Sequence, residues 1–390
     1  MRLRGLRSLR SLRFPRWLLG GSLLALLGCA STAEGPLDRA ALAKVARAQG
    51  LDPAAVVLPY EPTPEMKAWV HEMVPPAITK DDDRLQHLLA ALLDPKRLGL
   101  TYEAHYTGTA REVFASHRAN CLAFTNLFVG LARELGVKVF YLDVDDIEKF
   151  EKEGDLVVIS GHISTGYGSG RDVRILDFAA APTVHYRAIR PISDRTAVAL
   201  YYSNRGGELL RTGSQEEALK WLRTSVALDP ELARAWINLG VALRRTGDGA
   251  GAEAAYRKAL TIDPQAVSAY QNLASLLRLR GSDEAQKEAA ELTALVERLG
   301  SRNPFDYLNL GDLALGHGRL DEARQLYRKA LRLYHQSAEP YAAMGLWAVS
   351  AGDLREARKW LRKAAAIDPD NGRVKLLESR LKESGQKAAG

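Results

Sequence analysis

The strongest constraint on the fold of this 390-residue chain is a pattern that recurs at a regular interval in its second half. The interval from Trp236 to Tyr270 equals the interval from Tyr307 to Tyr341. In most units a glycine follows shortly after the aromatic residue, and an alanine comes roughly half a period later. A period of about 34 residues predicts helical hairpins stacked into a solenoid, because a single hairpin buries its apolar face only against its neighbours.

Aligning the chain on these positions gives five units. They carry Tyr202, Gly206, Ala218, Leu222 and Pro230; Trp236, Leu239, Gly240, Ala252, Tyr256, Ala259 and Pro264; Tyr270, Leu273, Ala274 and Leu277; Tyr307, Leu310, Gly311, Ala323, Tyr327 and Ala330; and Tyr341, Gly345, Ala357, Leu361, Ala364 and Pro369. The interval from Tyr270 to Tyr307 is longer than the regular one, so we expect an insertion or distortion in the third unit. The pattern resembles the tetratricopeptide repeat.

Packing explains the residue types at these positions. Glycine and alanine let two helices approach closely, a larger side chain fills the gap between them, and Asp-Pro ends the second helix. We therefore assign no ligand role to the tryptophans of this region, Trp221, Trp236, Trp347 and Trp360. The resemblance implies a concave surface that binds a peptide or protein partner. A spacer or a dimerisation arm is the alternative.

The net charge of +7 and the isoelectric point near 9.3 suggest a nucleic-acid-binding protein at first sight. Six arginines and no acidic residue or lysine stand in residues 1–28, however. Without these six, 48 of the 54 basic residues remain, and they nearly balance the 47 acidic residues. The basic excess belongs to this leader, so the rest of the chain offers no electrostatic case for nucleic acid.

The leader has the pattern of an export signal. Its arginines precede a short apolar run, Trp17–Leu27, which is shorter than the roughly 20 residues of a membrane-spanning helix. The run ends at Gly28 and Cys29, and it resembles a bacterial lipoprotein signal in which Cys29 is lipidated and becomes the N-terminus. Ala30, where an inner-membrane lipoprotein often has aspartate, favours the outer membrane facing the periplasm. The alternative is an ordinary signal peptide with an incidental cysteine.

Residues 100–190 have a mixed character. Helical patterns at Thr109–Ala115 and Asn120–Leu135 precede strand-like runs at Val137–Val144, Leu156–Ile163 and Val173–Phe178. Helices followed by strands, without regular alternation, predict an α+β fold rather than a doubly wound sheet. Further helical patterns precede them at Leu37–Gln49, Glu65–Val74 and Asp81–Leu93. We interpret Asp81, Asp82 and Asp83 as helix N-terminal acids rather than metal ligands.

The expected organisation therefore has five parts. They are a lipoprotein signal peptide at 1–28, a tether and N-terminal helix at 29–60, an α+β domain at 61–195, five repeats at 199–371, and a C-terminal capping helix and tail at 372–390.

Cys121 is the candidate nucleophile. It follows Asn120 and precedes an apolar run, which places the thiol at a helix N-terminus, where the helix dipole favours thiolate over thiol. If Cys29 carries lipid, Cys121 has no disulfide partner. His162, at the end of a strand-like run, is the best-placed base. A hairpin centred near Ser169–Gly170 would set Asp177 opposite His162, where its carboxylate fixes the imidazole tautomer.

These residues resemble the transglutaminase-like superfamily of papain-type cysteine enzymes over roughly residues 100–180. The resemblance rests on Thr109 to Phe114, Asn120-Cys121-Leu122, Ala132 to Val137, Gly161-His162-Ile163 and Ile175-Leu176-Asp177. It implies that Cys121 is the nucleophile, His162 the general base and acid, and Asp177 the orienting acid. The backbone N–H of Cys121 is one expected oxyanion donor. The implied reaction is acyl transfer through a thioester, resolved by water or by an amine.

Two interpretations compete on this evidence. The first is an envelope peptidase, amidase or transglutaminase whose repeats bind a peptide or protein. The second is a catalytically inactive scaffold for protein–protein interaction in envelope assembly. We expect no cofactor. A metal site at Cys121, His117 and His105 is disfavoured because a tight set of three or four ligands is missing.

Overall fold

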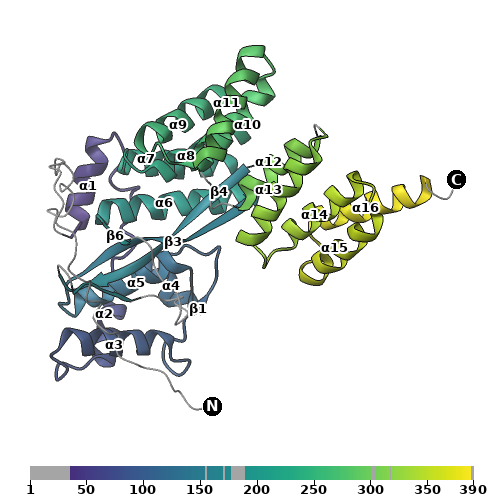
Figure 1. Cartoon of the computed structure of the whole chain (residues 1–390). Helices are drawn as coiled ribbons and strands as arrows, with labels where there is room; N and C mark the ends of the chain where they lie inside the picture. Colours follow the sequence, from purple (N-terminus) through teal and green to yellow (C-terminus); the bar gives the residue numbers. More distant parts are fainter. Residues whose placement is uncertain are drawn as a thin grey trace, which may run out of the picture. The chain divides into compact units, whose positions relative to one another are not determined.

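The computed structural model describes residues 36–153, 156–169, 172–176, 189–299, 304–316 and 318–387. The chain separates into two compact units, one formed by Met1–Ile147 and Gly161–Tyr201 and the other by Glu148–Ser160 and Tyr202–Gly390. Figure 1 shows helices and strands in the first part of the chain and helical hairpins in the second. Among the described helices, none is long and apolar enough to cross a membrane.

The first part of the chain contains five helices before its main sheet. They are α1 (Arg39–Ala48), α2 (Pro64–Met73), α3 (Asp81–Leu93), α4 (Ala110–Ser116) and α5 (Cys121–Glu134). Side chains cap most of their N-termini: the hydroxyl of Thr63 accepts from Met66 N, and that of Thr109 accepts from Glu112 N. The three aspartates lie in the first turn of α3, as predicted.

The main sheet has four strands in the order β5-β4-β3-β6. They are β3 (Val139–Glu153), β4 (Leu156–Tyr167), β5 (Arg174–Leu176) and β6 (Ile189–Ile192), and β3 pairs antiparallel with β6. Two short strands, β1 (Thr101–Tyr102) and β2 (Arg118–Ala119), form a separate parallel pair. The α+β composition matches the sequence-based expectation, although β1, β2 and β6 were not predicted.

Helix α5 is the centre of this part of the chain. Every residue from Leu122 to Ala132 is buried, as expected for a helix that is apolar on all sides. At Gly130 a Cβ atom would lie 2.1 Å from the carbonyl oxygen of Tyr60. The glycine therefore lets the chain around Tyr60 lie directly against the helix.

A part-buried ion pair fixes the end of α5. The Arg133 guanidinium donates to both carboxylate oxygens of Asp194, at 2.7 and 2.8 Å, and lies 5.3 Å from the ring centroid of Tyr60. Asp194 also accepts from the backbone N–H of Leu37 at 2.9 Å and from the Tyr60 hydroxyl at 3.0 Å. Burial lowers the pKa of Arg133, but the hydrogen bonds and charge of Asp194 outweigh it, so the net shift is upward. The cluster joins segments that are far apart in sequence.

The second part of the chain consists of helical hairpins and a final helix. The hairpins are α6 (Asp194–Arg211) with α7 (Gln215–Leu228), α8 (Ala233–Arg245) with α9 (Gly249–Ile262), α10 (Val267–Arg280) with α11 (Asp283–Leu299), α12 (Pro304–Gly316) with α13 (Leu320–Leu333), and α14 (Ala338–Ser350) with α15 (Leu354–Ile367). Helix α16 (Gly372–Lys387) follows them. Helix α11 has 17 residues where α7, α9, α13 and α15 have 14, which accounts for the longer spacing in the third unit.

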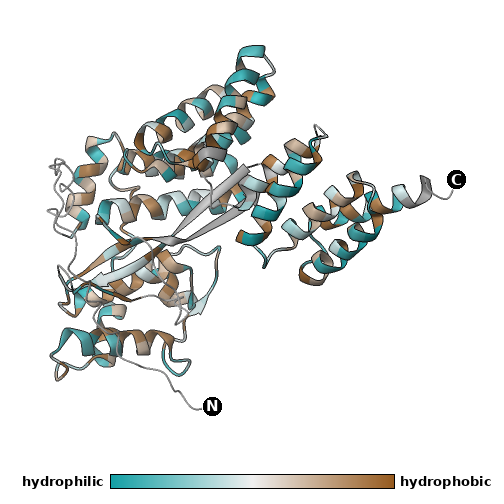
Figure 2. Cartoon of the chain, viewed as in Figure 1, coloured by the Kyte–Doolittle hydropathy of each residue, from teal (hydrophilic) through white to brown (hydrophobic). Residues whose placement is uncertain are grey.

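Close packing within the hairpins follows the predicted small-to-large pairing. A Cβ at Gly240 would lie 2.4 Å from the Tyr256 ring, and one at Gly311 would lie 2.4 Å from the Tyr327 ring. Hydrophobic and hydrophilic stretches alternate along the repeat helices (Figure 2). The indole N–H of Trp236 donates to a backbone carbonyl at 2.9 Å, and so does that of Trp347, consistent with structural roles.

Candidate functional site

Helix α5 begins at Cys121 because Asn120 caps it. The Asn120 side-chain oxygen accepts from Ala123 N at 2.9 Å, and its amide nitrogen donates to the Thr107 hydroxyl at 2.6 Å. The Asn120 backbone N–H donates to the carbonyl of Tyr106 at 3.1 Å. The capping residue Asn120 is buried, whereas Cys121 is half-buried. Cys121 is the free cysteine among the described residues. The predicted position of the thiol at a helix N-terminus is confirmed.

His162 is buried on β4, with 3% of its surface exposed. Its Nε2 atom lies 3.1 Å from the hydroxyl of Ser164, which is on the same face of the strand two residues later. The hydroxyl of Thr125 links β4 to α5, since it lies 3.1 Å from the carbonyl oxygen of Ile163 and 2.8 Å from that of Cys121. The structure therefore places the segment around His162 against the first turn of the Cys121 helix.

The β4–β5 register differs from the predicted one. The expected hairpin would pair Ile163 with Leu176, whereas the structure pairs Thr165 with Leu176. The register that set His162 directly opposite Asp177 is therefore wrong by two residues. Asp177 itself lies outside the described residues, and its role stays a prediction.

The difference arises where the hairpin turns. The strand-like run predicted from the sequence ends at Ile163, but β4 continues through Tyr167. The chain then turns at Gly168, whose φ of 91° is in the left-handed region that favours glycine. A Cβ there would lie 2.4 Å from the Asp172 carbonyl oxygen, and Asp172 N donates to the Ser169 carbonyl at 3.1 Å.

The alternative metal site does not form among the described residues. His105 and His117 are exposed, and within those residues no group of three or more His, Cys, Asp or Glu side chains is arranged to hold a metal ion. His117 has a left-handed backbone at the end of α4, with a φ of 58°. The predicted lipidation site, Cys29, lies outside the described residues.

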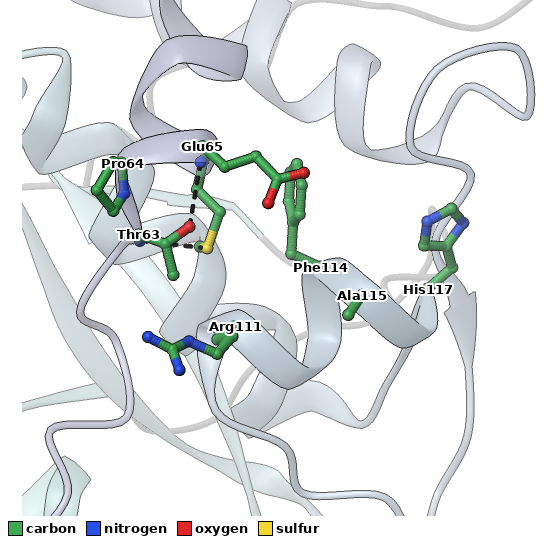
Figure 3. A pocket seen from close by; sticks show the side chains of 8 residues that line it. Thr63, Pro64, Glu65, Arg111, Phe114, Ala115 and His117 are labelled. Carbon is green, nitrogen blue, oxygen red and sulfur yellow. Dashed lines mark hydrogen bonds between the residues drawn. The ribbon is translucent and has the colours of Figure 1, made fainter.

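A surface pocket lies elsewhere, between α2 and α4. It is lined by Thr63, Pro64, Glu65, Met66, Arg111, Phe114, Ala115 and His117. Figure 3 shows Glu65 and Phe114 at this pocket, with Arg111 and His117 at separate sides of it. Neither Cys121 nor His162 lines it, and its ionisable residues Arg111, Glu65 and His117 are exposed. The pocket therefore does not provide the substrate cleft that a reaction at Cys121 needs.

The repeats carry polar groups with unmet bonding capacity on their first helices. Asn238 and Asn272 occupy equivalent positions in successive repeats, and both are buried, with 5% and 1% of their surface exposed. Among the described residues, Asn238 Oδ1 and Asn272 Nδ2 have no hydrogen-bond partner. The Asn238 Nδ2 atom donates to the hydroxyl of Ser203 on α6 at 2.9 Å, so this amide faces the neighbouring first helix.

Arg278, near the end of α10, is a half-buried cation. Its guanidinium donates to the neutral hydroxyl of Thr293 at 2.6 Å, and no carboxylate pairs with it among the described residues. Burial lowers its pKa. In the preceding repeat the equivalent residue, Arg244, likewise donates to a neutral hydroxyl, that of Ser275 at 3.1 Å.

Several of these residues escaped the sequence analysis. Thr125 and Ser164 are hydroxyl residues in apolar surroundings, which offers a weak signal because such residues usually satisfy the backbone of their own helix or strand. The recurrence of Asn238 at Asn272, and of Arg244 at Arg278, one repeat period later was a stronger signal. This recurrence indicates polar positions that repeat with the same period as the packing positions.

Comparison with known proteins supports the interpretation of the second part of the chain. Family models of the tetratricopeptide repeat match residues 204–267, 274–338 and 314–381. The region is therefore built from tetratricopeptide repeats. A search of curated proteins finds no match.

Solved structures with similar helical hairpins share little sequence with this chain. The pilF protein of Pseudomonas aeruginosa is 23% identical, with 50% of this chain and 87% of that chain covered and a TM-score of 0.41. YrrB, described as having an unusual peptide-binding site, is 20% identical, with 46% and 92% covered and a TM-score of 0.32. A chain from the Cut9–Hcn1 heterotetramer of APC/C is 20% identical, with a TM-score of 0.39. The match covers 45% of this chain and only 35% of that one.

Proposed function

We propose that this protein is an interaction scaffold whose tetratricopeptide repeats bind a peptide or protein partner that presents a carboxylate. The observation that carries the proposal is Arg278, a half-buried guanidinium without a carboxylate partner among the described residues. A desolvated cation gains more from an anion than from a neutral hydroxyl.

A random peptide library displayed on phage tests this proposal. We expect peptides selected on the purified protein to be enriched in Asp, Glu or a free C-terminal carboxylate, and Arg278→Gln to weaken their binding about tenfold or more. Arg280→Gln is the matched control, because Arg280 lies on the same helix but is exposed and already paired with Glu253. Equal effects of both variants, or peptides without acidic groups, would contradict the proposal.

Thiol chemistry at Cys121 is the second candidate function. The observation that favours it is the Thr125 hydroxyl, which bonds the backbone beside buried His162 and the carbonyl of Cys121 itself. In the proposed reaction, His162 takes the thiol proton, the thiolate attacks a carboxamide carbon, and His162 protonates the leaving amine. The thioester is then resolved by water or by an amine. Asp177 remains the proposed orienting acid.

Alkylation of Cys121 tests this second candidate. In a Cys29→Ser background Cys121 is the single cysteine, so intact mass reports its labelling by iodoacetamide directly. We expect fast labelling near pH 6, where an ordinary cysteine thiol, with a pKa of about 8.5, is almost fully protonated and reacts slowly. We expect His162→Gln to lower the labelling rate at pH 6 to that of an ordinary thiol. Slow labelling that the variant does not change would leave the scaffold as the function.

We further propose a lipid anchor at Cys29 and a location in the bacterial envelope, at the outer membrane facing the periplasm. The proposal rests on the arginine-rich leader, the short apolar run and Gly28-Cys29. In bacteria fed a labelled fatty acid, the protein should incorporate label and enter the detergent phase, whereas Cys29→Ser should do neither. Label in the Cys29→Ser variant would place the modification elsewhere.

A further inference from the structure

A buried hydroxyl side chain joins the helix that carries Cys121 to the strand that carries His162, and a second one contacts His162 within that strand. Thr125, with 2% of its surface exposed, lies one turn after Cys121 on α5. Its Oγ1 atom is 2.8 Å from the Cys121 carbonyl oxygen and 3.1 Å from that of Ile163 on β4. A bond to Cys121 alone would be ordinary back-bonding within a helix. The second contact is different, because it crosses between the two elements beside His162.

Ser164 acts on the imidazole itself. Its Oγ atom lies 3.1 Å from His162 Nε2, and both side chains are buried, with 1% and 3% of their surface exposed. A hydroxyl either accepts a hydrogen bond from Nε2–H or donates one to a bare Nε2, and in both cases the contact fixes the orientation of the ring. An orienting partner of the imidazole is therefore present within the described residues.

Thr165 shows that burial alone does not give a hydroxyl on this strand a hydrogen-bond partner. It is fully buried next to Ser164, yet its Oγ1 atom has no hydrogen-bond partner among the described residues. Thr165 points to the other face of the strand from His162 and Ser164. Replacing its unbonded hydroxyl by a methyl group should cost little. This residue is therefore the natural control for the other two.

We propose that Thr125 and Ser164 are positioning residues that hold the His162 imidazole ready to take the proton of Cys121. The inference rests on the second candidate function, thiol chemistry. Ser164 orients the ring through Nε2, and Thr125 fixes the distance between the strand and the first turn of α5. The proton moves from Sγ to the imidazole, and the electron pair left on sulfur attacks the electrophile. With iodoacetamide, an S–C bond forms, the C–I bond breaks, and iodide leaves.

The test compares alkylation rates of the full chain in the Cys29→Ser background between pH 5 and 9. We expect Ser164→Ala and Thr125→Val to slow labelling at pH 6 at least fivefold and to move the midpoint of the pH profile upward. Thr125→Ser keeps the hydroxyl and should stay within twofold of the parent, as should Thr165→Val. Circular dichroism and a thermal unfolding scan identify the variants that are folded. If Thr125→Val does not fold, Ser164→Ala decides the outcome.

The outcomes distinguish a failure of the positioning role from a failure of the thiol chemistry on which it rests. If His162→Gln leaves the labelling rate unchanged, thiol activation by His162 is absent, and both fail. If His162→Gln slows labelling while Ser164→Ala and Thr125→Val do not, the Cys–His pair stands and the positioning role is overturned. Slowing by Thr165→Val to the same extent would also overturn it, because any change on the strand would then have the same effect.

Discussion

The repeats and the region around α5 bury their residues in different ways. In the repeats, the same contact recurs from hairpin to hairpin, as with Gly240 against Tyr256 and Gly311 against Tyr327. Around α5, each buried polar contact occurs once and joins distant parts of the sequence. Arg133 and Asp194 are 61 residues apart, and Thr125 is 38 residues from its partner on β4.

The difference separates two sources of specificity. A repeated small-to-large contact specifies a hairpin, and its loss at one place leaves the neighbouring hairpins with their own contacts. A single buried polar contact has no duplicate, so removing one partner leaves the other group desolvated and unpaired. The comparison predicts large, local losses around α5 and smaller ones in the repeats.

The largest loss is expected from Arg133→Leu. The side chains of Arg133 and Asp194 are only 18% and 10% exposed, so the change leaves a largely desolvated carboxylate without its cation. We expect the free energy of unfolding of this part of the chain to fall by about 3–5 kcal/mol. Hydrogen exchange measured by mass spectrometry assigns the loss to α1–α5 or to the repeats.

Arg118→Leu is the matched control for this prediction. The Arg118–Glu103 pair lies in the same part of the chain but is exposed, at 50% and 42%, so we expect its loss to cost less than about 1 kcal/mol. Similar losses for the two variants would show that burial does not distinguish the pairs.

A smaller loss is expected from Gly240→Ala in the second repeat. The new Cβ would lie 2.4 Å from the Tyr256 ring, which is fully buried, so the ring must move and the stability should fall by about 1–3 kcal/mol. Gly207→Ala on α6 is the control, because among the described residues no atom beyond its own stretch of helix lies within 4 Å of a Cβ built there. It should stabilise the protein by roughly 0.5–1 kcal/mol through helix propensity. Urea unfolding measures both, and a stabilising Gly240→Ala would refute the close-packing argument.

The sequence predicted the repeats well for the same reason that they tolerate change. Each packing position is seen several times, so the period is visible without knowledge of any long-range contact. Even the irregular third unit could be predicted, because Tyr270 and Tyr307 are three residues too far apart and α11 is longer. The cap at Asn120 and the helix start at Cys121 were equally local signals.

The rest depended on contacts that the sequence does not display. The β4–β5 register depends on where the hairpin is centred, and the sequence offers three glycines between 166 and 170 at which the chain can turn. The predicted centre near Ser169–Gly170 shifts the pairing of Thr165 by two residues from the one in the structure. Strand β6 is only four residues long, and its partner segment on β3 lies far earlier in the sequence, so no local pattern marked it.

Alkaline pH probes the buried polar region directly. Burial, then the charge of Asp194, raises the pKa of both Tyr60 and Tyr141 above the ordinary value. The folded state therefore disfavours tyrosinate, so the stability is full below about pH 10 and falls above it by roughly 1.4 kcal/mol per pH unit for each tyrosine. Urea unfolding between pH 8 and 11 should show this slope, and Tyr60→Phe should reduce it.

The smallest effect should come from the charged surface of the repeats. Arg257 pairs with Glu288 at 2.9 Å, but the two side chains are 48% and 36% exposed, so solvent screens the pair. We expect Glu288→Gln to lower the stability by no more than about 0.5 kcal/mol, and 1 M salt to remove the difference. The effect of Arg133→Leu should persist in the same salt, because buried charges are screened far less. If salt removed both effects, the Arg133–Asp194 pair would be solvated like the surface pair, and the contrast between the two regions would disappear.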